Sequence, residues 1–223
     1  MLLLVTDTSG KNGSVALALA GETRPDEVRV IESVPLTGGT FSAQLVPQIA
    51  ALLEKHEFKK FDIGAFVVVS GPGSFTGLRV GLAAIKALAE ILAKPIVPVS
   101  LLEVVALASG KQGTVLAALD AGRAEVYAGE YEITGQSARL LREQLIPKAD
   151  LSPAASGFHL STPEPSIAGQ AGTMPLKVDT ISAEMIAIRG WQKLQAHETV
   201  SPGQLDANYI RRSDAEIFVK MNS

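Results

Sequence analysis

The segment from Thr76 to Ala93 has the composition of a helix that is apolar on two sides. One apolar stripe follows helical spacing, and a second stripe lies on roughly the opposite side of the same helix. A helix at the surface of a globular protein needs only one such stripe, so this helix is expected to be buried on two sides. The first stripe comprises Leu78, Leu82, Ile85, Ala89 and Leu92, and the second comprises Val80, Ala84, Ala87 and Ile91.

Two interpretations of the second stripe are open. In one, other parts of the same chain cover it, as happens in many α/β cores. In the other, the stripe binds a helix of a partner protein, and small residues such as Gly77 and Ala84 let that helix approach closely. The preceding helix, predicted for residues 42–57, would then add exposed apolar residues such as Val46 and Ala50.

The order of predicted elements around this helix indicates a mixed α/β fold. Three strands come first, with a turn predicted at Asn12-Gly13 between the first two. Helices and strands then alternate, which gives the order β-β-β-α-β-α-β-α. This is the order of one lobe in the actin/Hsp70/sugar-kinase (ASKHA) fold. The predicted strands cover residues 2–6, 14–20, 28–36, 63–69 and 96–99, and the predicted helices cover residues 42–57, 76–93 and 101–109.

A shorter second lobe is predicted for residues 111–223, after a first lobe of residues 1–110. Further strands are predicted at 114–120 and 125–132, with a short one at 139–141. Residues 150–172 are rich in Ser, Pro, Gly and Ala, and they are predicted to be loop with one short strand. An amphipathic helix is predicted at 181–194, and we expect that the tail can pack back on the first lobe.

The composition excludes several kinds of site. The chain has 223 residues and no cysteine, so disulfides and thiolate chemistry are absent. His56, His159 and His197 are too far apart in sequence for a histidine-based protease motif. A net charge of -3 argues against a protein that binds nucleic acid by itself. No apolar run reaches the roughly 18 residues of a membrane span, so a soluble cytoplasmic protein is expected.

The glycine-rich stretch Ser70–Gly81 reads SGPGSFTGLRVG. Such a turn before a helix can aim backbone N–H groups at a phosphate, which makes Gly71, Gly73 and Ser74 candidates for a phosphate-proximal site. The stretch lacks the lysine of a P-loop and the spacing of a dinucleotide-binding turn. The favoured interpretation is that it shapes a strand-to-helix turn and allows close packing.

Asp7 and Asp120 each stand at the end of a predicted strand and precede a turn, so the two openings resemble a weak internal duplication. Together with Thr8 and Ser9, they are candidates for a nucleotide site in which the carboxylates hold Mg²⁺ through water. The alternative is that each carboxylate caps its own turn. The short second lobe favours this alternative, so we predict no metal site and no catalytic residue.

Four segments, in order along almost the whole chain, resemble the TsaB (YeaZ) family. The stretch Ser70–Gly81 is the most specific of the four. Asp7-Thr8-Ser9 follows the first strand, Leu119–Tyr127 is similar to the D-A-R-x-x-E-V-Y stretch of the family, and Asn208–Arg211 is similar to its P-x-Y-x-R ending, with Ala207 in place of the usual proline.

The resemblance implies a shortened relative of the transferase TsaD, without its histidine metal ligands. Such a chain would be a non-catalytic partner that TsaD requires to make N6-threonylcarbamoyladenosine in tRNA, joined by the ATPase TsaE. We expect it to form a homodimer when alone and to meet tRNA only indirectly. No cofactor is expected on the isolated chain, and ATP or ADP with Mg²⁺ is expected only in the complex. The partner-binding residues expected on the first two helices are Leu45, Val46, Ile49, Ala50, Gly77, Arg79, Val80, Ala83, Ala84 and Ala87.

The chain departs from the family at the start of the first helix, where Phe41-Ser42-Ala43 replaces a His-Ser-Glu-like triplet. Two alternative functions are carried forward. One is a hydrolase, because relatives have been labelled glycoproteases, and the other is an ATP-binding kinase-like protein of the same fold. The basic tail with Arg211, Arg212 and Lys220 has two interpretations. One is a contact with tRNA or a partner, and the other is a solvated terminus or an ordering contact with its own lobe.

Overall fold

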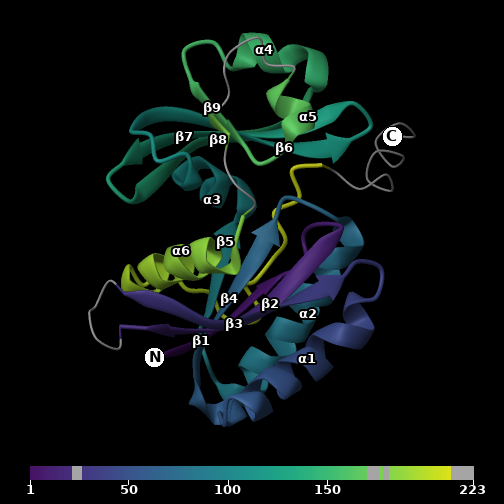
Figure 1. Cartoon of the computed structure of the whole chain (residues 1–223), viewed down its shortest axis with the longest axis vertical. Helices are drawn as coiled ribbons and strands as arrows, with labels where there is room; N and C mark the ends of the chain where they lie inside the picture. Colours follow the sequence, from purple (N-terminus) through teal and green to yellow (C-terminus); the bar gives the residue numbers. More distant parts are fainter. Residues whose placement is uncertain (22–26, 170–175, 178–180, 212–223) are drawn as a thin grey trace. The chain divides into compact units, whose positions relative to one another are not determined.

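The computed structural model describes residues 1–21, 27–169, 176–177 and 181–211. The chain forms two compact units, each built around a five-stranded sheet (Figure 1). The first unit comprises Met1–Val104 and Asp179–Ala207, and the second comprises Val105–Val178 and Asn208–Ser223. The predicted lobes, 1–110 and 111–223, therefore differ from these units chiefly in the segment 179–207, which returns to the first unit.

The first sheet has the strand order β3-β2-β1-β4-β5. Strand β2 is antiparallel to both of its neighbours, β1 and β3, whereas β4 and β5 run parallel to β1. The central strands are almost continuously apolar because both faces of the sheet are covered. The strands are β1 (Leu2–Asp7), β2 (Asn12–Ala20), β3 (Val28–Thr37), β4 (Ile63–Gly71) and β5 (Ile96–Ser100).

Helices cover the two faces of this sheet, as Figure 1 shows. Helices α1 (Phe41–Lys55) and α2 (Phe75–Leu92) lie on one face, and α6 (Ala183–Gln195) lies on the other. Because alternate side chains of a strand point to opposite faces, Leu4 packs with the first pair of helices and Leu3 packs with α6. The predicted positions of these elements are confirmed to within a few residues.

The turn between β1 and β2 differs from the prediction. The two strands do form an antiparallel hairpin, in which Asp7 pairs with Ser14. Asn12 and Gly13, however, are the first residues of β2 and not the turn itself. Gly13 is required there for a different reason, since a Cβ at this position would lie 2.4 Å from the carbonyl oxygen of Asp7.

The second sheet repeats the connectivity of the first. Its order is β10-β9-β6-β7-β8, with β6, β7 and β8 antiparallel and β9 parallel to β6. Read from the edge strand β8, this is the order of the first sheet, so the ASKHA-type arrangement is confirmed for both units. The second unit is shortened in its last two strands. The strands are β6 (Gly113–Gly122), β7 (Glu125–Thr134), β8 (Ser137–Pro147), β9 (His159–Thr162) and β10 (Leu176–Lys177).

Two predictions for the second unit contained too little secondary structure. Strand β8 has 11 residues, whereas only residues 139–141 were predicted. The segment 150–172, predicted to be loop with one strand, contains β9 and also two short helices. Leu151 and Ile167 of these helices are fully buried against β6 and β7. The two short helices therefore cover part of the second sheet, which the Ser- and Pro-rich composition of the segment did not indicate. The short helices are α4 (Leu151–Ala154) and α5 (Pro165–Ala168).

Helix α6 explains why the chain returns to the first unit. Ile186, Ala187 and Trp191 form the stripe that packs on β1, β4 and β5. Helix α3 (Leu101–Ala108) crosses the boundary between the units, which falls between Val104 and Val105. Within the described part of the chain, no helix is both long enough and apolar enough to cross a bilayer.

Candidate functional site

The loop after β1 and the turn before α2 lie against each other in the first unit. The backbone N–H of Ser74 donates a hydrogen bond to the carbonyl oxygen of Ser9 at 2.6 Å. A Cβ on Gly73 would lie 2.2 Å from that same oxygen, so only glycine fits at this approach. The structure thus brings together the candidate segments Asp7-Thr8-Ser9 and Gly71–Ser74.

The carboxylate of Asp7 closes the turn at the end of β1. Its Oδ1 accepts hydrogen bonds from the backbone N–H of Ser9 at 2.8 Å and from the Ser9 hydroxyl at 2.6 Å. Burial raises the pKa of Asp7, and the two bonds from Ser9 lower it by a smaller amount. Asp7 therefore closes the turn through its bonds to Ser9, while burial disfavours the charged form of its carboxylate.

Helix α2 begins at this loop with its N-terminal donors partly satisfied. Ser74 is the N-cap residue, and its Oγ accepts a hydrogen bond from the N–H of Gly77 at 3.2 Å. A Cβ on Gly77 would meet the Thr8 carbonyl oxygen at 2.2 Å, and one on Gly81 would meet the Thr8 hydroxyl at 2.2 Å. The glycines of the Ser70–Gly81 stretch therefore allow α2 to pack directly against the loop after β1.

Helices α1 and α2 also leave an apolar face exposed. Between the ends of α1, the exposed residues from Ala43 to Ala51 carry no charge. On α2, only Ala83 and Ala87 are exposed between Arg79 and Glu90, and Ile91 beyond them is 72% exposed. We call this surface the α1/α2 face, and it comprises Ala43, Val46, Pro47, Ala50, Ala51, Ala83, Ala87 and Ile91.

The structure divides the ten predicted partner-binding residues into three groups. Three of them, Leu45, Ile49 and Gly77, are buried in the first unit and face its own core. Val80 and Ala84 are half-buried against that core, so this chain covers part of the second stripe of α2 itself. The exposed members are Val46, Ala50, Arg79, Ala83 and Ala87.

One exposed feature at the start of α2 was missed by the sequence analysis. The guanidinium of Arg79 stacks on the ring of Phe75, with Cζ 3.7 Å from the ring centroid. Phe75 remains 38% exposed. The spacing of four residues on one helix was the available signal, because such residues lie on the same face.

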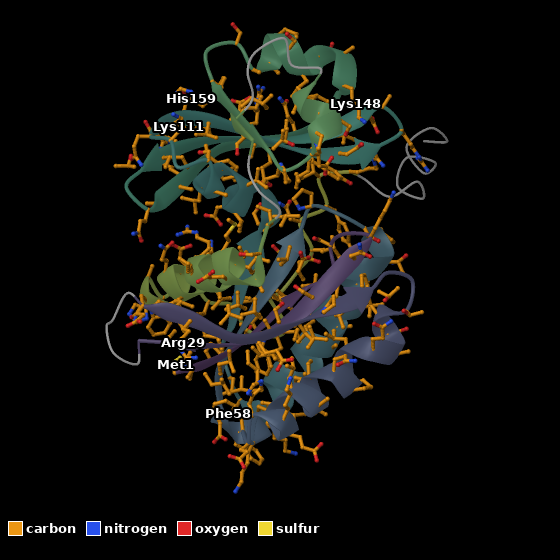
Figure 2. All side chains as sticks on the ribbon, in the orientation of Figure 1. Met1, Arg29, Phe58, Lys111, Lys148 and His159 are labelled. Carbon is orange, nitrogen blue, oxygen red and sulfur yellow. The ribbon has the colours of Figure 1, made fainter. Side chains whose placement is uncertain are left out.

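In the second unit, Asp120 repeats the turn that Asp7 makes in the first. Its Oδ1 accepts a hydrogen bond from the N–H of Gly122 at 2.7 Å, which is the same two-residue reach as from Asp7 to Ser9. Its Oδ2 forms an ion pair with Lys148, labelled in Figure 2, at 2.8 Å. Asp120 is thus held by its own unit, as expected of a turn-capping carboxylate.

Glu164 lies beside this turn. Its Oε2 accepts a hydrogen bond from the backbone N–H of Asp120 at 2.9 Å. Burial raises the pKa of Glu164 above its ordinary value, the hydrogen bond from Asp120 opposes this, and the charge of Asp120 adds to it. In the described ranges, no three His, Asp or Glu side chains gather closely enough to hold a metal ion.

Asn208 and Arg211 contact their own unit. Arg211 forms an ion pair with Glu125, and its guanidinium lies 5.9 Å from the centroid of the Tyr127 ring. Asn208 donates a hydrogen bond to Glu143 Oε2 at 2.5 Å. For Arg211, these contacts favour the ordering contact over a role in binding RNA, while Arg212 lies outside the described residues.

The repeated sheets and the exposed helix pair define an ASKHA-type α/β protein with a candidate partner-binding surface. The family model described as "TsaD: tRNA N6-adenosine threonylcarbamoyltransferase" matches residues 36–187. This match covers more than half of the chain, and the chain belongs to this family, in its TsaB (YeaZ) branch.

Named relatives agree with this placement. The chain is 34% identical over 149 residues to the "tRNA threonylcarbamoyladenosine biosynthesis protein TsaB" of Bacillus subtilis, a match that covers 66% of this chain. The relative of the same name from Escherichia coli is 32% identical over 135 residues, or 59% of this chain. The matched region spans only 60% and 55% of the lengths of these two relatives.

Two solved structures share the fold over nearly their whole length. YeaZ from Pseudomonas aeruginosa superposes with a TM-score of 0.74 at 24% identity, covering 93% of this chain and 99% of that one. A second structure, described as an uncharacterized protein with similarity to peptidase YEAZ from Pseudomonas aeruginosa, has a TM-score of 0.76 at 26% identity, covering 94% and 99%. The likeness to YeaZ establishes the two-unit ASKHA-type fold.

Proposed function

We propose that this chain is the non-catalytic partner of a TsaD-type transferase in the formation of N6-threonylcarbamoyladenosine in tRNA. The names of the sequence relatives supply the pathway, since they are called tRNA threonylcarbamoyladenosine biosynthesis proteins. The observation that carries the proposal is the exposed apolar α1/α2 face. Each of its two helices already covers the sheet with one side and presents small uncharged residues on the other.

The composition of the α1/α2 face suits a protein partner. The exposed side of a surface helix is normally charged or polar, because nothing else keeps it soluble. Here the exposed residues of α1 between Ala43 and Ala51 are all apolar, and Val46 is 49% exposed. The cores of protein interfaces are depleted in charge in the same way. Small side chains also let a second pair of helices approach to about 8–10 Å between axes.

The proposed contribution of the chain is conformational. A partner that binds only the active arrangement of the transferase raises the population of that arrangement in proportion to its preference. The chain would then increase the rate of modification without contacting the reacting groups. With a net charge of -3 and Arg211 held by Glu125, it would meet tRNA through its partner. Nucleotide and Mg²⁺ would belong to the assembled complex, with TsaE as a further subunit.

The test uses the full-length chain and TsaD from the same organism. We expect the two proteins to form a complex in size-exclusion chromatography with light scattering, and TsaD to modify tRNA only when the complex forms. Ala83→Glu places a charge at the centre of the α1/α2 face, and it should abolish both the complex and the modification. Ala83 is a better reporter than Val80 or Ala84, because these two also pack on the core of the unit.

The matched control is Glu184→Arg on α6, an exposed residue on the opposite side of the same sheet. This variant should form the complex like the original chain. Circular dichroism should give the same helix content for both variants. Full tRNA modification by TsaD alone, or an unchanged complex with Ala83→Glu, would remove the proposal.

A further inference from the structure

We infer that Phe41 positions the first turn of α1 on the start of α2, and that it couples this turn to the loop after β1. Phe41 is the first residue of α1, and it is 5% exposed. It is therefore not part of the α1/α2 face, although it belongs to the helical turn that carries one end of that face. The inference rests on the proposed function for its link to a partner, and it adds a residue that holds the partner-binding surface in place.

The ring of Phe41 lies between β2 and α2. A Cβ on Gly13 of β2 would lie 3.0 Å from Cε1 and 3.2 Å from Cζ of the ring. A Cβ on Gly77, in the first turn of α2, would lie 3.2 Å from Cε2. The ring thus contacts two positions that carry no side chain, and it takes up the space that their side chains would need. We call these two glycines the Phe41 socket.

The Phe41 socket is also in contact with the loop after β1. A Cβ on Gly13 would lie 2.4 Å from the carbonyl oxygen of Asp7, and one on Gly77 would lie 2.2 Å from the carbonyl oxygen of Thr8. At each glycine, a backbone oxygen of this region and an edge of the Phe41 ring therefore approach the same point. Close-packed groups of this kind transmit a displacement instead of absorbing it. A shift of the loop after β1 must consequently move the ring.

The first turn of α1 has few other attachments. The N-cap residue, Thr40, gives no side-chain hydrogen bond to the helix backbone. Pro47 lies inside the helix and has no N–H to donate to the carbonyl oxygen of Ala43, so the ladder of helical bonds is interrupted there. Gln44 accepts one hydrogen bond from the end of β3 at 3.0 Å, and this bond is exposed to solvent. The burial of Phe41 therefore contributes much of what holds this turn in place.

This turn sets the position of two exposed residues of the α1/α2 face, Ala43 and Val46. Phe41, Leu45 and Ile49 are spaced by four residues, and all three are buried on the core side of α1. Because Phe41 is the first member of this stripe, it fixes the rotation and the height of the helix at its N-terminal end. Without the ring, Ala43 and Val46 would shift relative to the rest of the face.

The other end of α1 is attached by a separate contact. Glu32 of β3 forms an ion pair with Lys55 and a hydrogen bond with His56, each at 2.7 Å. Leu53, in the last turn before these residues, is buried in the core. Loss of the Phe41 ring should therefore loosen the first turn of α1 and leave its last turn in place.

The first experiment measures hydrogen exchange of individual amides in the full-length chain. In Phe41→Ala, the amides of Gln44, Ser9 and Ser74 should exchange about tenfold faster or more, because the first turn of α1 and the loop after β1 loosen together. Phe41→Leu keeps a smaller apolar group and should give an intermediate increase. The matched control is Leu53→Ala, which removes a buried apolar side chain from the same helix. It should affect exchange at the end of α1 and not at Ser9 or Ser74.

The second experiment measures the affinity of each folded variant for TsaD from the same organism by titration calorimetry. Phe41→Ala should weaken the complex by about tenfold or more, since part of the α1/α2 face is displaced. Leu53→Ala should weaken it by less than about threefold, at a comparable loss of melting temperature. Comparison of the two variants separates the position of the face from the overall stability of the chain.

The outcomes distinguish this inference from the proposed function. If Phe41→Ala does not raise exchange at Ser9 and Ser74 above that in Leu53→Ala, the coupling is wrong. If both variants weaken the TsaD complex equally, Phe41 acts through stability alone and its positioning role is wrong. If the exchange result holds but the original chain does not bind TsaD, the coupling stands and the proposed function fails.

Discussion

Arg189 of α6 donates a hydrogen bond from Nη2 to Oε1 of Glu103 in α3 at 2.7 Å, and neither side chain is more than 10% exposed. Lys193 lies 3.7 Å from the other oxygen of Glu103. This buried pair joins α6, which comes late in the chain, to α3 at the end of the segment Met1–Val104. It links residues 86 positions apart, which is a contact that no local pattern predicts.

Breaking this pair from one side should be costly. Arg189→Met leaves the Glu103 carboxylate buried with only the longer contact to Lys193, and a loss of about 3 kcal/mol in the free energy of unfolding is expected. Replacing both residues, with Glu103→Leu and Arg189→Met, removes the uncompensated charge and should recover most of that loss. Chemical denaturation of the three chains measures the difference. Equal losses in the single and double variants would show that the charge pair is not the cause.

Gly81 should not tolerate even the smallest side chain. A Cβ at this position would lie 2.2 Å from the hydroxyl and 3.1 Å from the methyl group of Thr8. Gly81→Ala is expected to lower stability by about 1–3 kcal/mol, because α2 must move away from the loop after β1. Gly203→Ala is the control, since no heavy atom lies within 4 Å of the added carbon.

Thr8 provides an internal check of this explanation. In Thr8→Ala the two closest atoms are removed, so adding this change to Gly81→Ala should recover part of the lost melting temperature. A double variant that is no more stable than Gly81→Ala would mean that another contact causes the loss.

Asp7 should make stability depend on pH in a defined direction. Burial raises its pKa above the ordinary 3.8, so the folded chain holds the proton more tightly than the unfolded chain. The charged carboxylate is therefore unfavourable above the folded pKa, and its penalty disappears as the pH falls through that pKa toward 3.8. Asp7→Asn keeps an oxygen that accepts both bonds from Ser9 and removes the charge.

The variant Asp7→Asn should consequently be more stable than the original chain at pH 7. A gain of about 1 kcal/mol would raise the melting temperature by roughly 2–4 °C in a chain of this size. The advantage should shrink as the pH falls toward 4, as measured by differential scanning calorimetry. An advantage that stays constant with pH would contradict the assignment. Asp206→Asn, at an exposed residue, is the control.

Arg211 should stabilise the second unit more than other surface arginines do. Its side chain is 25% exposed and that of its partner Glu125 is 35% exposed, whereas the Arg139–Glu132 pair is 68% and 45% exposed. Arg211→Ala is expected to cost about 1 kcal/mol and Arg139→Ala only a few tenths, because solvent screens the more exposed pair. Hydrogen exchange along β7 should rise in the first variant. Equal exchange in the two variants would contradict an ordering role for Arg211.

The elements with strong local patterns were predictable. The continuous apolar run of β1 and the two stripes of α2 are local patterns over short stretches. Such a pattern can be read from the sequence without knowing which other elements pack against it. Helices α4 and α5 were not predictable in this way, and for strand β9 only its presence somewhere within residues 150–172 was predicted. They are only four residues long, and the apolar residues that bury them, such as Leu151 and Ile167, are isolated in a polar sequence. Their placement depends on β6, which lies more than 25 residues earlier.

The sequence by itself determined that α2 has two apolar sides, that each unit opens with a strand, an aspartate and a turn, and that no cysteine chemistry is available. These properties follow from residue identity and spacing along short segments. Only the tertiary structure decided that Leu45 and Ile49 face the core while Ala83 and Ile91 remain exposed, and that Lys148 engages Asp120. Such outcomes depend on which distant segments meet, because a side chain becomes buried or paired only through neighbours that the fold brings to it.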